Sequence, residues 1–70
     1  AILKYFSNLD LSKREIEVAN LILDGKSYKQ IGNYLFIAEG TVSKHASNIF
    51  KKAEVQNRRE FVKRFKGKRR

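Results

Sequence analysis

Apolar residues recur at helical spacing in four separate stretches of the chain. The first stretch has its apolar residues at Ile16, Ala19, Ile22 and Leu23. Ser12 and Glu15 have the spacing of a capping box, in which each side chain hydrogen bonds a backbone N–H that the first helical turn leaves unpaired. Gly25 follows as a stop, because glycine takes a positive φ without steric cost. The pattern predicts a first helix that begins after Ser12 and ends before Gly25.

A second helix begins almost at once. Ser27 and Gln30 form another capping-box pair. A single apolar stripe follows at positions i, i+3 and i+7: Tyr28, Ile31 and Leu35. Gly32 lies inside this helix, where glycine costs roughly 1 kcal/mol relative to alanine. We interpret Gly32 as a place where another helix approaches closely. Residues 36–38 then break the helical period.

The third stretch predicts a helix over about residues 39–53. Its apolar residues fall within about 100° of arc, and they are Val42, Ala46, Ile49, Phe50 and Ala53. The opposite face is polar and mixes small side chains with cations: Gly40, Lys44, Ser47, Asn48 and Lys51, with Ser43 at one edge. A short fourth helix starts at Asn57, with Glu60 completing an N-x-x-E cap and with Phe61, Val62 and Phe65 on its apolar side.

These four helices predict an all-α fold, a compact four-helix bundle over residues 11–66. A chain of 70 residues has room for one such domain with a small core. Residues 1–10 carry no helix-start signal, and we expect an N-terminal tail or the end of a linker. Residues 67–70 have no packing content, and we expect a basic, disordered tail. The chain begins without methionine, so we expect a fragment of a longer protein or a processed product.

Positive charge is concentrated in the last 30 residues. The chain has 16 Lys and Arg against seven Asp and Glu, a net charge of +9. Residues 1–40 hold five residues of each sign, whereas residues 41–70 hold eleven basic residues against Glu54 and Glu60. A basic balance gathered in one part of a small domain indicates a polyanionic partner. The alternative is a solvated basic surface with no specific partner.

Several kinds of chemistry are disfavoured by what the chain lacks. It has no cysteine and a single histidine, His45, so no set of residues resembles a zinc site. No nucleophile or carboxylate pair stands in a recognisable relation to His45. We therefore expect no enzyme activity, no metal and no cofactor. No apolar run approaches the roughly 18 residues that span a membrane, and the N-terminus lacks the pattern of a signal peptide.

The second and third helices have the arrangement of a helix-turn-helix. The major groove of B-DNA is about 12 Å wide and admits one helix. The inserted helix needs one buried face to fix its angle, and an outer face with donors and short side chains so that its backbone approaches the bases. The third helix meets both conditions. We therefore expect its N-terminal half to enter the major groove.

The chain also resembles a known family in the order and spacing of several motifs. These run from L11-S-K-R-E-I-E-V18 through G25-K-S-Y-K-Q-I31, L35-F-I-A-E-G-T-V-S-K-H45 and I49-F-K-K52 to V55-Q-N-R58. They resemble the LuxR/GerE-type DNA-binding domain, the C-terminal half of NarL/FixJ-type response regulators and of quorum-sensing regulators. The resemblance covers roughly residues 9–66. It implies four helices, sequence-specific binding of duplex DNA, and a fourth helix that often forms a dimer interface.

The resemblance assigns roles to the motif T41-V-S-K-H45 and the turn after it. Thr41 matches a position that commonly contacts phosphate. Ser43, Lys44 and Ser47 match positions that read bases, whereas Val42 and Ile49 match core positions. The chain departs from the family in having Ala38 where a serine or threonine usually caps the third helix, which loses a cap worth roughly 1 kcal/mol. It also has Gly32, Ala53 and Glu54 where alanine, leucine and glycine are common.

The remaining candidate DNA-binding residues come from the chemistry of each side chain. Lys44 and Lys51 are expected to contact guanine or phosphate, and Asn48 a base or a phosphate. Ser27, Tyr28 and Lys29 stand at the start of the second helix, where the positive helix end favours an anion. Lys52 and Arg58 add phosphate contacts from the flank, and His45 either packs or hydrogen bonds phosphate. The whole set is Ser27, Tyr28, Lys29, Thr41, Ser43, Lys44, His45, Ser47, Asn48, Lys51, Lys52 and Arg58.

The sequence therefore predicts the DNA-binding domain of a cytoplasmic bacterial transcriptional regulator of the response-regulator type. Its expected partners are double-stranded DNA, a second copy of the chain held through the fourth helix, and RNA polymerase, with no membrane. One alternative is region four of a sigma factor, although the V-x-N-R motif favours the LuxR-type domain. The other is a protein-interaction module in which the phenylalanines of the fourth helix dock on a partner domain and the basic tail only increases solubility.

Overall fold

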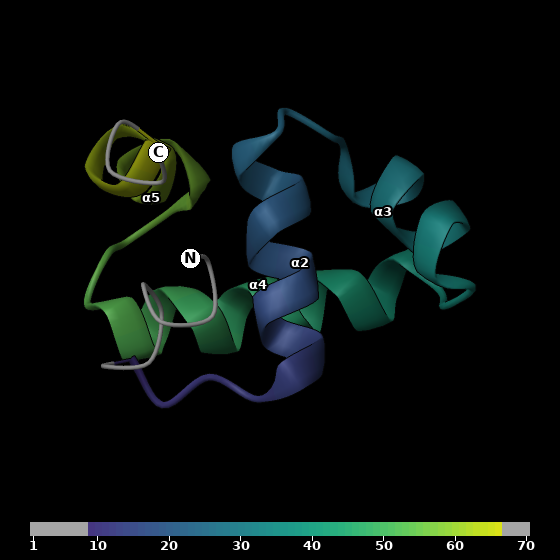
Figure 1. Ribbon diagram of the computed structural model, residues 1–70, viewed down its shortest axis with the longest axis horizontal. Coiled ribbons are helices and arrows are strands. Elements are labelled where there is room, and N and C mark those ends of the chain that lie inside the picture. Colours follow the sequence, from purple (N-terminus) through teal and green to yellow (C-terminus); the bar gives the residue numbers. More distant parts are fainter. Residues whose placement is uncertain (1–8, 67–70) are drawn as a thin grey trace.

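The computed structural model describes residues 9–66, and Figure 1 shows the four helices of this part of the chain. They are α2 (Lys13–Leu23), α3 (Tyr28–Leu35), α4 (Glu39–Ala53) and α5 (Arg58–Phe65). The predicted all-α fold and its four helices are confirmed. The predicted disordered tail at residues 67–70 and most of the predicted N-terminal tail lie outside the described residues.

Helix α2 crosses α4 and forms the centre of the arrangement. Helix α3 lies beside one end of α4 and α5 beside the other, with α2 between them (Figure 1). The core lies where the four helices meet. Its buried residues are Val18, Ala19, Ile22, Leu23, Ile31, Val42, Ala46, Ile49, Ala53 and Phe61. Each helix therefore contributes one apolar face, as the helical spacing predicts.

Local capping sets where three of the helices begin. The Ser12–Glu15 and Ser27–Gln30 pairs both close as reciprocal capping boxes at the starts of α2 and α3. At α5 the Asn57 side chain accepts from the Glu60 N–H at 3.0 Å. The Glu60 carboxylate, however, accepts from the Gln56 N–H at 2.9 Å rather than from Asn57. The fourth helix therefore begins where the sequence predicts, with its cap extended by one residue.

The turn between α3 and α4 explains Gly32 in a way the sequence did not. A Cβ atom at Gly32 would lie 2.7 Å from the Ile37 carbonyl oxygen and 3.5 Å from the Glu39 nitrogen. The close neighbour is therefore the backbone of the turn and the first residue of α4, rather than the side of a packed helix. Phe36 makes the turn with a φ of 60° and leaves its side chain 93% exposed. The interruption predicted at residues 36–38 is this turn.

Candidate nucleic-acid interface

Helix α4 presents two contrasting faces. Val42, Ala46 and Ile49 are completely buried on its inner face. Its outer face consists of exposed residues, which are Gly40, Thr41, Ser43, Lys44, Ser47, Asn48 and Lys51. Fixing one face in the core leaves the other rigidly oriented, which a helix needs to enter a groove at a defined angle. Six of these seven residues, all except Gly40, belong to the predicted site, and they share one exposed surface.

The N-terminus of α4 has no side-chain cap. Ala38 is its N-cap residue and its side chain makes no capping hydrogen bond, while its carbonyl accepts from the N–H groups of Thr41 and Val42. The missing cap expected from Ala38 is therefore confirmed. Glu39 supplies one negative charge to the first turn and Lys51 and Lys52 supply two positive charges to the last. This distribution of charge suits the helix dipole.

The start of α3 lies close to the starts of α4 and α5. A shallow hollow of about 540 Å³ is lined by residues from all three places: Gly25, Ser27, Tyr28, Gln30, Glu39 and Arg58. The structure thus brings the predicted residues Ser27 and Tyr28 together with the first residue of α4. Lys29 is exposed beside them. This second group of candidate residues is therefore close to the N-terminal end of the α4 outer face.

Arg58 is held by the protein itself. Its guanidinium donates to the Lys26 carbonyl and lies 5.5 Å from the centre of the Tyr28 ring. Both partners belong to the segment that leads into α3, so Arg58 ties the start of α5 to the start of α3. It is half-buried. The sequence predicted only a phosphate contact for Arg58, because its partners within the fold are about thirty positions away in the chain.

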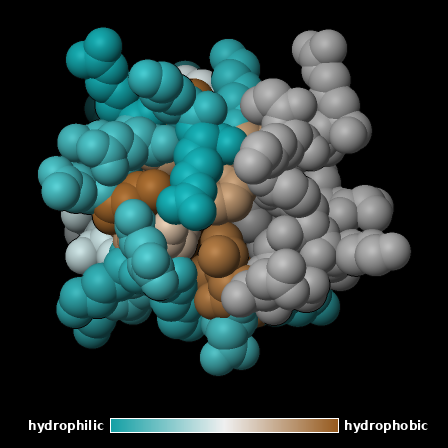
Figure 2. All heavy atoms as spheres, turned by 90° about the vertical axis from the view of Figure 1, so that its left-hand side faces the viewer, coloured by the Kyte–Doolittle hydropathy of each residue, from teal (hydrophilic) through white to brown (hydrophobic). Residues whose placement is uncertain are grey.

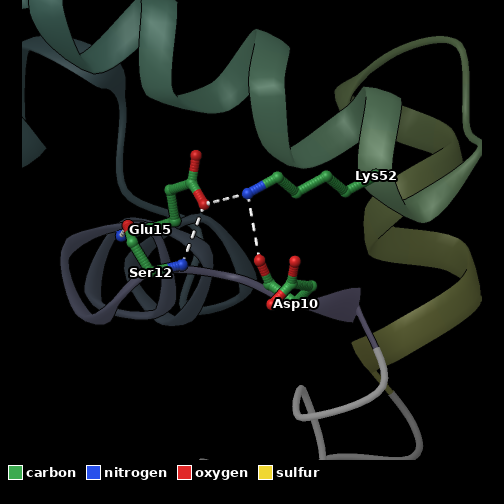
Figure 3. Close-up of polar contacts among 4 residues, drawn as sticks. All are labelled: Asp10, Ser12, Glu15 and Lys52. Atoms are coloured by element: carbon green, nitrogen blue, oxygen red, sulfur yellow. Dashed lines mark hydrogen bonds and ion pairs between the residues drawn. The ribbon is translucent and has the colours of Figure 1, made fainter.

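Lys52 points toward α2 rather than along the outer face of α4. Figure 3 shows its Nζ between the Glu15 carboxylate, 2.9 Å away, and the Asp10 carbonyl oxygen, 3.0 Å away. The same Glu15 oxygen accepts from the Ser12 N–H at 2.9 Å. Lys52 is thus paired within the fold, and its side chain keeps 39% of its exposure. His45 is half-buried on the same flank of α4.

Glu15 stays charged in spite of its burial. The Glu15 side chain is only 7% exposed, and burial by itself raises the pKa of a carboxyl group. The hydrogen bonds from Ser12 and Lys52 and the positive charges of Lys52 and His45 act in the opposite direction and prevail, so the pKa of Glu15 lies below its ordinary value of 4.5. The sequence was interpreted to give Glu15 only a capping role. Its spacing of three, four and seven residues from Val18, Ala19 and Ile22 is the signal that would have indicated its burial.

No metal-binding cluster occurs within residues 9–66, where no three His, Cys, Asp or Glu residues gather closely enough to hold an ion. In the same range, no helix is both long and apolar enough to cross a membrane.

The shorter helix α3, a short turn and helix α4, which has one buried and one exposed face, together define a helix-turn-helix domain. Comparison with known proteins then gives the family: residues 9–65 match the model of the bacterial regulatory proteins of the luxR family, and the chain belongs to that family. The resemblance inferred from the sequence motifs is confirmed. No solved structure matches the chain.

Three relatives illustrate where this domain occurs. The uncharacterized response regulatory protein YgeK of Escherichia coli is 42% identical over 60 residues, 86% of this chain and 41% of that protein. The transcriptional regulatory protein DegU of Brevibacillus brevis is 46% identical over 52 residues, 74% of this chain and 22% of its own length. The transcriptional regulatory protein DesR of Bacillus subtilis is 47% identical over 58 residues, 83% of this chain and 29% of its own length. The chain thus spans less than half the length of these relatives.

Proposed function

We propose that this chain binds duplex DNA sequence-specifically, with α4 in the major groove, as the DNA-binding part of a cytoplasmic transcriptional regulator. The observation that carries the proposal is the exposed outer face of α4 on a helix whose inner face is completely buried. Membership of the luxR family, together with relatives named as transcriptional regulators, supports it.

Within this proposal, the chemistry of each exposed side chain determines the DNA group that it contacts. Lys44 and Lys51 donate hydrogen bonds to guanine or to phosphate, and Ser43, Ser47 and Asn48 donate or accept at base edges. Thr41 and the uncapped N-terminus of α4 face phosphate, because unpaired N–H groups and the positive helix end attract an anion. Ser27, Tyr28 and Lys29 add a second phosphate contact. Phosphate contacts of this kind make the affinity strongly salt-dependent.

Lys52, His45 and Arg58 have a different place in the proposal. Each lies at the flank of the exposed surface, and Lys52 and Arg58 already bind partners within the fold. The first role of Lys52 and Arg58 is to hold α4 and α3 in place. Any phosphate contact they make is additional and comes from the part of each side chain that remains exposed.

We further propose that two copies occupy neighbouring half-sites about one helical turn apart, as helix-turn-helix proteins commonly do. The predicted contact through the last helix places the two copies against each other at the apolar edge of α5. Val62 and Phe65 form that edge, and both are only partly buried. RNA polymerase remains a proposed partner of the DNA-bound pair.

An NMR titration tests the proposal directly. The isotope-labelled chain is titrated with duplexes selected from a random-sequence pool, at two salt concentrations. We expect backbone shifts at the exposed residues of 40–51 and at 27–29, weakening steeply as salt rises. Selection should enrich one sequence motif. Binding without any enriched motif would reject sequence specificity, and shifts absent from α4 would reject the groove assignment.

A further inference from the structure

Helix α5 carries a second basic surface that the α4 interface does not use. Arg59, Lys63 and Lys66 stand at positions i, i+4 and i+7, so they share one face of the helix. All three are exposed. Among residues 9–66, none of them pairs with a carboxylate, because the ion pairs found there join Arg14 to Glu17 and Lys52 to Glu15. We refer to Arg59, Lys63 and Lys66 as the α5 stripe.

The stripe points away from the helices against which α5 packs. Phe61, two positions from Arg59 and Lys63, is completely buried, with its ring 5.5 Å from that of Phe50 in α4. Arg64 reaches back to the Ala53 carbonyl of α4 at 3.2 Å. At 100° per residue, the stripe lies across the helix from these contacts. The outer face of α4 consists of other residues, so the two basic surfaces share no side chain.

Arg59 is unfavourably placed in the free chain, whereas Lys63 lies in the last turn of α5, where the helix dipole favours a cation. Arg59 and Lys63 are like charges one turn apart, which disfavours the helix. Arg59 also lies in the first turn of α5, where the helix dipole disfavours a cation. Glu60 is the acidic residue of α5, and its carboxylate accepts from the Gln56 N–H. An anionic partner relieves these repulsions.

The surroundings of the stripe have the anatomy of a protein interface. A shallow hollow of about 660 Å³ is lined by Arg58, Arg59, Val62 and Lys63. Figure 2 views the molecule from the side on which α5 lies in Figure 1, and it shows a small hydrophobic patch with hydrophilic side chains along part of its edge. An apolar centre with a charged rim is typical of protein–protein contacts.

We infer that the α5 stripe is a docking surface for an acidic surface of another protein, separate from the DNA interface of α4. Charge complementarity argues for this occupant. A second copy is a poorer occupant of the stripe itself, since it would bring the same three cations opposite their equivalents. Val62 lines the hollow beside the stripe, so of the two residues proposed to contact a second copy only Phe65 lies outside that hollow. The inference goes beyond the proposed DNA binding and does not depend on it.

Poly-L-glutamate serves as the probe, because it presents carboxylates on a polypeptide. The labelled 70-residue chain is titrated with it twice, once alone and once saturated with a selected duplex. We expect shifts at residues 58–66 in both titrations, with the duplex still bound in the second. Lys63→Glu should weaken poly-L-glutamate binding about fivefold or more at low salt. Lys13→Glu, the same charge change at an exposed position of α2, should not.

Three results would overturn the inference. Shifts confined to α4, or release of the duplex, would show that poly-L-glutamate only competes for the DNA interface. A loss of duplex affinity in Lys63→Glu as large as that in Lys44→Ala would make the stripe a DNA contact. A change in the number of chains on the duplex, measured by sedimentation of Lys63→Glu, would assign the stripe to a second copy. If the chain does not bind DNA, the duplex titration shows it. The poly-L-glutamate titration of the free chain then still tests the α5 stripe.

Discussion

Glu15 of α2 and Lys52 of α4 form an ion pair of 2.9 Å that joins the start of one helix to the end of the other. Glu15 also closes the capping box of α2 through the Ser12 N–H, and Lys52 also donates to the Asp10 carbonyl (Figure 3). One carboxylate oxygen and one ammonium group thus fix three segments: the chain entering α2, the first turn of α2 and the last turn of α4. The junction therefore ties the C-terminal end of α4 to the start of α2.

Removing the cation should destabilise the fold. Lys52→Met leaves the Glu15 carboxylate buried without its cationic partner, and we expect a loss of about 1–3 kcal/mol in the free energy of unfolding. Lys51→Met is the matched control, because Lys51 is exposed on the outer face of α4; it should change stability by less than about 0.5 kcal/mol. Urea denaturation measures both. Equal values for the two variants would mean that the ion pair contributes nothing.

The Glu15 carboxylate should make the free energy of unfolding decrease at acidic pH. The pKa of Glu15 is lower in the folded chain than its ordinary value of 4.5. At a pH between the folded and the ordinary pKa, the unfolded state binds more protons than the folded state. The stabilisation that ionised Glu15 contributes to the fold is therefore complete above pH 4.5, and it is lost as the pH falls through the folded pKa. We expect the difference in unfolding free energy between the parent chain and Glu15→Gln to shrink from about pH 5 downward. A difference that stays constant over that range would contradict the assignment.

The helices and their bounds were predictable because their determinants are local. The Ser27–Gln30 capping box and the interruption at residues 36–38 lie within a few positions of the ends they set. The pairs Glu15–Lys52 and Arg58–Tyr28 were not predicted, because their members are 37 and 30 positions apart and meet only after the helices pack. Lys52 and Arg58 looked like free cations in the sequence for the same reason. Glu15 is an intermediate case, since its helical spacing is a signal of burial that the prediction did not use, and it gives no indication of its partner.

Alanine is common at the position of Gly32 in the family, so the effect of an added methyl group in this chain depends on whether its turn can shift. The alanine Cβ would lie 2.7 Å from the Ile37 carbonyl oxygen, and that oxygen belongs to the backbone of the turn. We expect Gly32→Ala to cost about 1–3 kcal/mol by overpacking, in spite of the better helix propensity of alanine. Gly40→Ala is the control, because nothing lies within 4 Å of its Cβ position. Thermal unfolding that shows Gly32→Ala as stable as Gly40→Ala would mean that the turn shifts freely.

Restoring the absent cap of α4 should stabilise the domain. Ala38 has φ −67° and ψ 150°, close to the φ −73° and ψ 163° of Ser27, whose side chain caps α3. A serine at position 38 therefore has the backbone geometry to accept from the first turn of α4. We expect Ala38→Ser to gain about 1 kcal/mol and Ser27→Ala to lose a similar amount. Chemical denaturation compares the two. A loss of stability in Ala38→Ser would show that the first turn of α4 has no room for the hydroxyl group.

Substitution of Lys44 tests whether its side chain contacts a base or a phosphate. It is exposed on the outer face of α4, so Lys44→Ala should leave stability unchanged and weaken binding to a selected duplex by about 1–3 kcal/mol if it contacts a base. In that case discrimination at one base pair is lost. If Lys44 contacts phosphate instead, affinity falls evenly across sequences and the salt slope decreases by about 1. Lys13→Ala, an exposed cation of α2, controls for net charge. Fluorescence anisotropy with matched and mismatched duplexes at several salt concentrations separates the two cases, and an affinity equal to that of Lys13→Ala would remove Lys44 from the interface.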